Sequence, residues 1–171
     1  MTAVTKVMAT LTAAQAAPAA SAACSTNWGV KAKVVTRAEG PGTARASGVR
    51  AGIHGCFDRL VIDLGRGAEP GYRVRYVAKV HAEGSGKAIA LPGHAALQIT
   101  LTDHAAAKFS KTGHVLAPVA GFHVLRKVVA AGSFEGYTAI GVGVRAKLPF
   151  RVEWLKGPGH RSRLIIDIAR N

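Results

Sequence analysis

Alternation of apolar and polar residues with a period of two is the feature that most limits how this chain can fold. In GYRVRYVAKV, residues 71–80, tyrosine and valine fill one set of alternate positions, while the other set includes Arg73, Arg75 and Lys79. Successive side chains of a β-strand point to opposite faces of a sheet, so the pattern predicts a half-buried strand. Further strand-like runs lie at residues 57–65, 95–101, 122–132, 137–146, 148–155 and 163–169. Because no long stretch has the helical period, we predict an all-β sandwich or barrel with Gly-rich turns.

Two of the strand-like runs are near copies of each other, since residues 59–65 read RLVIDLG and residues 163–169 read RLIIDIA. Each copy carries one carboxylate, Asp63 or Asp167, among hydrophobic residues. Two such carboxylates could perform acid–base chemistry, but a structural role is simpler. We predict that each one pairs with a nearby arginine or caps the end of its strand.

The segments between the strands are rich in glycine. Residues 29–55 have little periodicity and include GPGTARASG, which predicts a loop or linker. Residues 102–121 predict a second long loop, with a short helical piece at 105–109. In YTAIGVGVRA, Gly141 and Gly143 fall on one face of a strand, where they favour a bend or the close approach of another backbone segment.

The N-terminal residues have the order of a secretory signal. Lys6 precedes a mildly apolar run at residues 7–17, and the small residues after Pro18 include an Ala-Ser-Ala cleavage pattern at 20–22. We predict export, with a disordered signal peptide at 1–23, an N-terminal arm and linker at 24–55 and a β domain at 56–171. A disordered Ala-rich tail is the alternative for the first segment. No other segment approaches the roughly 20 apolar residues of a membrane span, so we expect no transmembrane segment in the mature chain.

The chain has 2 cysteines, Cys24 and Cys56, which suit a disulfide in an exported protein. Closing a loop of this length stabilises a fold by roughly 3–4 kcal/mol in the chain-entropy model. The residues SAAC also resemble a lipobox, so lipidation of Cys24 is the alternative, and one thiol cannot serve both purposes. We predict the disulfide, with the arm CSTNWG tied to the strand that begins near Cys56 and with Trp28 packed nearby.

The charge is strongly unbalanced, with 23 Lys and Arg against 9 Asp and Glu and a formal net charge of +14. Such an excess predicts attraction to polyanions, which include nucleic acid, anionic lipid and anionic wall polymer. A cationic surface that serves only solubility is the alternative.

Motifs of cofactor binding and catalysis are incomplete in this sequence. GSGK at 84–87 resembles a phosphate-binding loop, but His81 and Ala88 stand where that loop needs glycine and Ser or Thr. The 7 histidines have none of the spacings of a zinc site, and no G-x-S-x-G motif occurs. We therefore expect no cofactor, no metal and no enzymatic activity.

The repeated phrase belongs to an ordered series of segments between residues 24 and 169. These segments are CSTNWG, CFDRLVIDL, GYRVRYV, GSGKAIAL, AGSFEGYTAIGVGVRAKLPFRVEWL and RLIIDIA. The series resembles the AMIN domain, the non-catalytic targeting module of bacterial cell-wall amidases, and in particular the AMIN-like proteins exported by actinobacteria. The resemblance implies a compact β-sandwich of two small sheets, bracketed by the two similar strands. It also implies an exported cell-envelope module with no enzyme attached, secreted or associated with the envelope.

Basic residues in the strands suggest how such a module would bind its ligand. We predict a cationic sheet face that holds peptidoglycan or an anionic wall polymer, formed by Arg73, Arg75, Lys79, Arg145, Lys147 and Arg151. Arginine suits this role because its planar guanidinium binds carboxylate and phosphate with two hydrogen bonds. Aromatic residues could stack on sugars or pack in the core: Tyr72, Tyr76, Tyr137 and Trp154. The alternatives are a protein–protein adaptor in envelope assembly and a β-barrel that binds nucleic acid, of which the second is disfavoured by the export signal.

Overall fold

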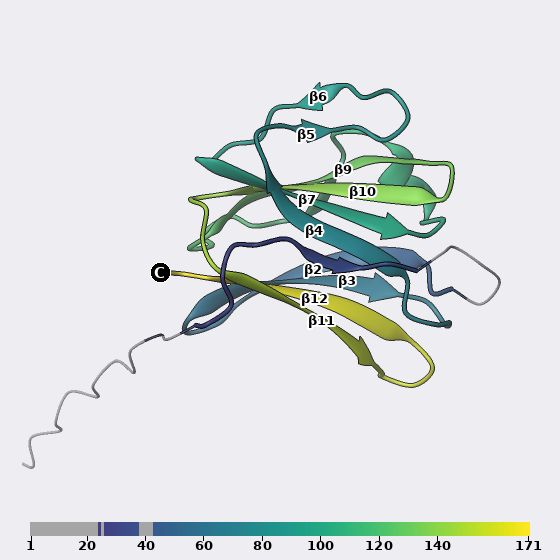
Figure 1. Ribbon diagram of the computed structural model, residues 1–171, viewed down its shortest axis with the longest axis horizontal. Coiled ribbons are helices and arrows are strands. Elements are labelled where there is room, and N and C mark those ends of the chain that lie inside the picture. Colours follow the sequence, from purple (N-terminus) through teal and green to yellow (C-terminus); the bar gives the residue numbers. More distant parts are fainter. Residues whose placement is uncertain (1–23, 25, 38–42) are drawn as a thin grey trace, which may run out of the picture.

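Two antiparallel β-sheets stacked face to face form the body of the protein (Figure 1). The computed structural model describes Cys24, residues 26–37 and residues 43–171. The six-stranded sheet has the order β1 (Lys33–Val35), β4 (Gly71–Val77), β7 (Ala95–Thr102), β10 (Tyr137–Val144), β9 (Leu125–Phe134) and β8 (Val115–Ala117). The four-stranded sheet has the order β11 (Phe150–Lys156), β12 (Ser162–Ala169), β3 (Phe57–Leu64) and β2 (Ala46–Ile53). The predicted all-β sandwich of two sheets is confirmed.

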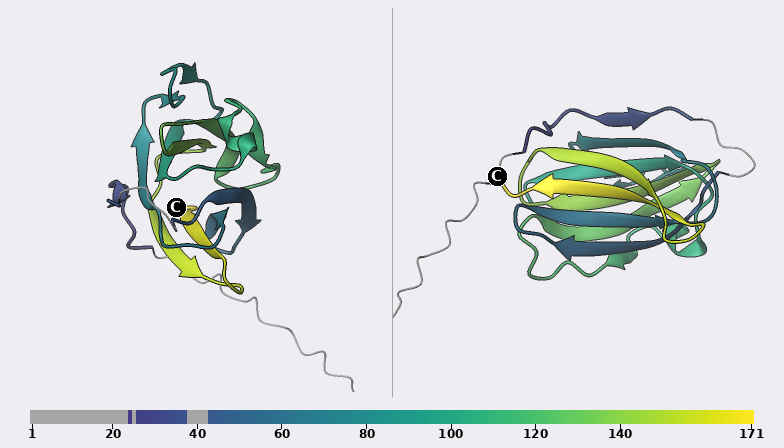
Figure 2. Two further views of the ribbon diagram at one scale, coloured as in Figure 1. Left: turned by 90° about the vertical axis from the view of Figure 1, so that its right-hand side faces the viewer. Right: turned by 90° about the horizontal axis from the view of Figure 1, so that it is seen from below.

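The hydrophobic core lies between the two sheets, and Figure 2 shows how the sheets are stacked. Alternate residues of β3 and β12 point inward, and those of β4, β7 and β10 meet them from the other sheet. The buried strand residues include Leu60, Ile62, Leu64, Val74, Leu97, Ile99, Leu101, Ile140, Val142, Leu164, Ile166 and Ile168. Inward-pointing and outward-pointing side chains therefore alternate along these strands, as the period of two in the sequence predicts.

The two copies of the repeated phrase form the central pair of the four-stranded sheet. β3 and β12 run antiparallel, with Arg59 opposite Asp167 and Asp63 opposite Arg163. The phrase is therefore complementary to itself, because antiparallel pairing places the arginine of each copy beside the aspartate of the other. Opposite charges at such positions stabilise the pairing of strands.

The structure corrects the linker predicted over residues 24–55, because residues 46–53 form β2 and pair with β3 along its length. Val49 and Ala51 contribute to the core, while Gly48 and Gly52 interrupt the apolar pattern that would have marked a strand. The loop predicted at 102–121 contains a short 3-10 helix, η1 (Ala107–Ser110), and the edge strand β8. The signal peptide and disorder predicted for residues 1–23 lie outside the described residues.

A small hairpin covers part of the outer face of the six-stranded sheet. Residues 80–93, here called the flap, include β5 (Val80–His81) and β6 (Ala88–Ile89) (Figure 1). Val80 packs on Ala131 and Ala139 in a second, smaller core. A Cβ atom on Gly143 would lie 2.3 Å from the carbonyl oxygen of Pro92. The close backbone approach predicted for the two glycines is confirmed at Gly143, whereas Gly141 lies against the side chains of Val80 and Leu91 of the flap.

The N-terminal part of the described chain connects the two sheets. Cys24 and residues 26–37, here called the arm, begin at the disulfide between Cys24 and Cys56, which confirms the predicted bridge. Trp28 packs edge-on against Phe57 at 5.7 Å, as predicted, and the carbonyl of Gly29 accepts a hydrogen bond from the first residue of β11. The arm then reaches the other sheet, where β1 pairs with β4 (Figure 2).

Candidate functional site

The part of the six-stranded sheet that the flap leaves uncovered forms an open groove of about 380 Å³. We call it the β4 groove. Its floor consists of polar side chains on neighbouring strands: Arg73 and Arg75 on β4, Gln98, Thr100 and Thr102 on β7, and Tyr137 on β10. The strand register sets Arg73 beside Thr100 and Arg75 beside Gln98. The two guanidinium groups therefore project from an exposed strand face next to hydroxyl and amide groups.

The arm and the flap border the β4 groove on opposite sides. On one side β1 pairs with β4 and sets Val34 beside Arg73, and the arm ends at Arg37, which forms a 3.0 Å ion pair with Glu69. On the other side the flap contributes Glu83, and its Gly84 lies against the half-exposed ring of Phe134. The two borders of the groove therefore come from segments that are far apart in the sequence.

The depression continues along β4 beyond the β4 groove. A second hollow shares Arg75 and Gln98 with it and extends past Lys79, and a third, of about 530 Å³, runs from Lys79 to His94 and Lys147. Among the described residues, β1 pairs with residues 72–74 of β4, and this pairing does not extend to residues 75–77. Four of the residues predicted from sequence, Arg73, Arg75, Lys79 and Lys147, therefore lie along one continuous track.

The other two predicted residues, Arg145 and Arg151, do not add their guanidinium groups to this track. The carbonyl of Arg145 lies 3.1 Å from the Nδ1 atom of His94 at the end of the track, but the guanidinium of Arg145 donates a hydrogen bond to the carbonyl of Arg170. Arg151 lies on β11 in the four-stranded sheet, where it forms ion pairs of 2.9 Å with Asp167 and 3.1 Å with Glu153. The chain crosses from one sheet to the other between these two arginines, and the spacing of basic residues in the sequence gives no sign of that crossing.

Asp63 and Asp167 confirm the predicted pairing with arginine. Asp167 is fully buried and accepts two hydrogen bonds from Arg59, at 2.7 and 2.8 Å, and one from Arg151 at 2.9 Å. The guanidinium of Arg151 also stacks on the indole of Trp28, with its carbon 4.7 Å from the ring centroid. We call Arg59, Arg151, Asp167 and Trp28 the Asp167 cluster, in which the carboxylate is matched by two cations and closed from solvent.

Asp63 is more exposed and binds Arg50 through two hydrogen bonds of 2.7 Å. These hydrogen bonds lower the pKa of the Asp63 carboxyl below its ordinary 3.8 against the effect of desolvation, and the charges of Arg50, Arg163 and Lys108 act in the same direction. Because the folded pKa is lowered, the pair stabilises the fold above about pH 4 and loses this effect as the pH falls through the lowered value.

The aromatic residues differ in how they contact the core and the β4 groove. Tyr72, Tyr76 and Trp154 pack against the core, and Tyr72 also borders the groove, whereas Tyr137 is 49% exposed and lines the groove. Sequence reasoning did not single out the polar residues of β7 or Arg37. The alternation of residues 95–102 carried a signal for Gln98, Thr100 and Thr102, since they occupy the polar positions of that strand.

The fold and the groove define a β-sandwich domain with a basic track on one outer face. The family model of the AMIN-like domain matches residues 44–170, and the chain belongs to this family. The match includes every strand from β2 to β12 and excludes β1 and Cys24. AMIN-like domains are non-catalytic modules, and this membership indicates a role in cell-wall targeting. A comparison with curated proteins found no match.

Two further observations concern the described residues. They contain no group of three or more His, Cys, Asp or Glu side chains arranged to hold a metal ion. In the same part of the chain, no helix has the length and apolar character needed to cross a membrane.

Proposed function

We propose that the protein is an exported, non-catalytic module of the cell envelope that binds peptidoglycan or an anionic wall polymer in the β4 groove. The observation that carries this proposal is the pair Arg73 and Arg75, exposed side by side above the polar row of β7. Membership of the AMIN-like family supports a cell-wall ligand. The Cys24–Cys56 disulfide supports export, because disulfides form and persist outside the reducing cytosol.

The chemistry of the groove suits a polymer with hydroxyl groups and negative charges. Arg73 and Arg75 would bind carboxylate or phosphate groups, since guanidinium forms two parallel hydrogen bonds with either. Threonine and glutamine side chains can exchange hydrogen bonds with sugar or polyol hydroxyls, and the exposed face of Tyr137 can stack on a sugar ring. The open track toward Lys79 and Lys147 leaves room for an extended chain.

A wall polymer fits this surface better than single-stranded nucleic acid does. Proteins that bind single strands stack successive bases on several aromatic side chains. Among the residues that line the described track, Tyr137 is the half-exposed aromatic ring, while the rings of Tyr72 and Tyr76 pack against the core. The positive charge of the track is therefore combined mainly with hydroxyl and amide groups.

The double substitution Arg73→Ala/Arg75→Ala tests the proposed function. We expect the affinity for purified cell walls in a sedimentation assay to fall by roughly tenfold to a hundredfold, because each lost charged hydrogen bond is worth about 1.5–3 kcal/mol and part of the loss is recovered by water. The dependence of binding on salt should also become weaker.

Arg66→Ala/Lys156→Ala is the matched control, since both residues are exposed and neither lines the β4 groove. This variant loses the same formal charge and should keep most of its binding. Equal losses of binding in the two variants would show that net charge alone attracts the wall. Unchanged binding by Arg73→Ala/Arg75→Ala would show that the β4 groove does not bind the wall.

A further inference from the structure

The self-complementary pairing of β3 and β12 gives the four-stranded sheet an approximate twofold symmetry. Its centre is the pair Val61 and Ile165, and the rotation exchanges Arg59 with Arg163 and Asp63 with Asp167. The Asp167 cluster should thus have a counterpart around Asp63 on the same outer face. Comparing the two carboxylates then shows whether Asp63 has the same partners and the same cover as Asp167.

The counterpart lacks two parts of the Asp167 cluster. Beside Asp167 the neighbouring strand carries Arg151, whereas the equivalent position beside Asp63 is Gly48. The arm covers the Asp167 cluster with Trp28, but Asp63 keeps 34% of its side chain exposed. The outer face is therefore closed at one of the two related places and open at the other.

A depression of about 360 Å³ occupies the open place. It lies between β2 and β3 on one side and the turn that joins β11 to β12 on the other, and Gly48, Asp63 and Arg161 are among its lining residues. The turn is fixed by a hydrogen bond of 2.7 Å from the amide of Gly157 to the carbonyl of Arg161. Gly48 opens the floor, because a Cβ atom there would occupy space between Asp63 and Lys108, 3.5 Å from the Asp63 Oδ2 and 3.7 Å from the Lys108 Nζ.

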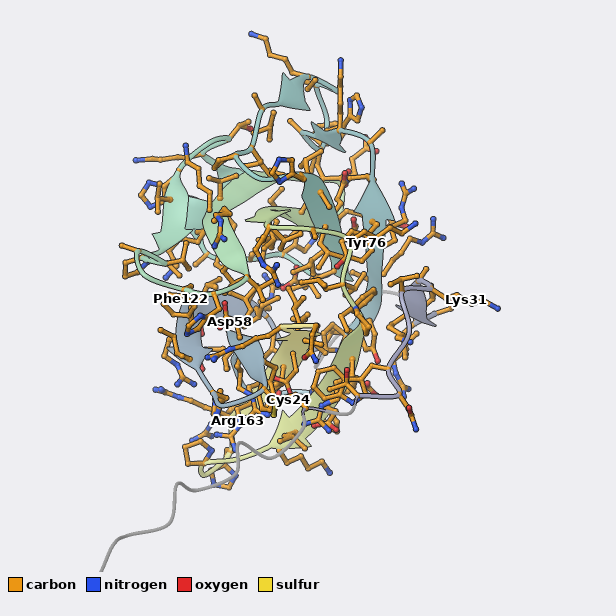
Figure 3. The ribbon with its side chains drawn as sticks, turned by 90° about the vertical axis from the view of Figure 1, so that its left-hand side faces the viewer. Cys24, Lys31, Asp58, Tyr76, Phe122 and Arg163 are labelled. Carbon is orange, nitrogen blue, oxygen red and sulfur yellow. A yellow bond between two sulfur atoms is a disulfide. The ribbon has the colours of Figure 1, made fainter. Side chains whose placement is uncertain are left out.

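The charges around this depression do not balance. Arg50 neutralises Asp63 through its two hydrogen bonds. Arg161, Arg163 and Lys108 remain, and among the described residues none of the three forms an ion pair within 4.0 Å. Arg163 stands directly across from Asp63 in the strand register, and Figure 3 shows it on the four-stranded sheet, apart from Tyr76 of the other sheet. Arg161 therefore lines the depression together with the neutralised Asp63. Arg163 and Lys108 lie next to it, the first across the strand register from Asp63 and the second 3.7 Å from a Cβ atom built on Gly48.

We propose that this depression is an anion site that takes a phosphate group, held by Arg161, which lines it, while Arg163 and Lys108 next to it supply further positive charge. A multiply charged oxyanion matches the surplus of positive charge, and guanidinium groups bind its oxygens in pairs. The site lies on the outer face of the four-stranded sheet, whereas the β4 groove lies on the outer face of the six-stranded sheet. The proposal therefore goes beyond the function proposed above and does not depend on it.

A titration of the isotopically labelled protein with inorganic phosphate at constant ionic strength, followed by NMR, tests this site. We expect saturable shifts of the amide signals of Gly48, Gly157 and Ser162, which line the depression. Acetate should give a weaker response at the same residues, because it carries a single charge. Shifts that stay linear and spread over the whole basic surface, or an equal response to acetate, would overturn the proposal.

Two variants test whether phosphate binds in the depression. Arg161→Ala should weaken phosphate binding by about tenfold, the effect of one charged hydrogen bond, whereas Arg66→Ala, which removes an exposed cation that lines neither the β4 groove nor the depression, should leave it unchanged. Gly48→Glu sets a carboxylate on the floor of the depression, and the contacts of its Cβ are ordinary ones. This variant should stay folded and lose the saturable response, because the added negative charge repels phosphate and the side chain fills the depression. Undiminished binding in both Arg161→Ala and Gly48→Glu would refute the site.

Discussion

Replacing Cys24 and Cys56 with serine is expected to lower the free energy of unfolding by about 3.5–4 kcal/mol. The bridge closes a loop with a sequence separation of 32, so its loss gives the unfolded chain more conformations. Denaturant unfolding of the oxidised wild type and of the Cys24→Ser/Cys56→Ser variant measures this difference. A difference below about 1 kcal/mol would contradict the expected stabilisation.

The same variant should also lose part of the β4 groove, because the disulfide holds the arm that supplies β1. Without the covalent tie, the arm keeps the edge-on packing of Trp28 against Phe57 and the short pairing of β1 with β4. Lys31 extends from the arm into solvent (Figure 3), and trypsin should cleave after it faster in the variant than in the oxidised wild type. Equal cleavage rates would show that the arm stays docked without the bridge and that the groove does not require it.

Replacing Asp167 with alanine is expected to lower the free energy of unfolding by about 3 kcal/mol. The substitution leaves Arg59 and Arg151 without the carboxylate that accepts their hydrogen bonds at the centre of the sheet. The value is at the lower end of the range for buried ion pairs, because the side chains of Arg59 and Arg151 are 26% and 36% exposed and can regain some water. Thermal or denaturant unfolding gives the difference directly.

Asp63→Ala is the matched control, since Asp63 is the symmetry-related aspartate of the repeated phrase. It should cost no more than about 1 kcal/mol, because the pair with Arg50 is largely solvated. Equal costs for Asp63→Ala and Asp167→Ala would show that closure by the arm adds nothing to the Asp167 cluster.

Much of the sandwich could be predicted from the sequence, because each strand with one buried face carries the period of two. β4 is the clearest case, since its alternation separates Tyr72, Val74 and Tyr76 from Arg73 and Arg75, and the structure has them on opposite faces. The repeated phrase indicated related strands, and the pairing of Asp63 and Asp167 with arginine followed from their surroundings. The disulfide could be predicted because the chain has 2 cysteines.

Other features could not be predicted, for identifiable physical reasons. β2 was hidden because Gly48 and Gly52 take alternate positions of the strand and carry no side chain to mark a face. β1 has three residues and depends on its pairing with β4 and on the contact of Lys33 with the ring of Phe150 in β11, both of which are distant in the sequence. Arg151 was grouped with Arg73 because local patterning indicates on which face of a strand a residue lies, but not to which sheet that strand belongs.

Arginine footprinting on protein bound to purified cell walls tests the central claim most directly. Phenylglyoxal modifies exposed guanidinium groups, and mass spectrometry of the peptides reports the extent of modification at each arginine. If the polymer lies in the β4 groove, Arg73 and Arg75 should be protected in the bound protein, while Arg66 reacts as it does in the free protein. Protection elsewhere, with Arg73 and Arg75 reacting as in the free protein, would contradict the account.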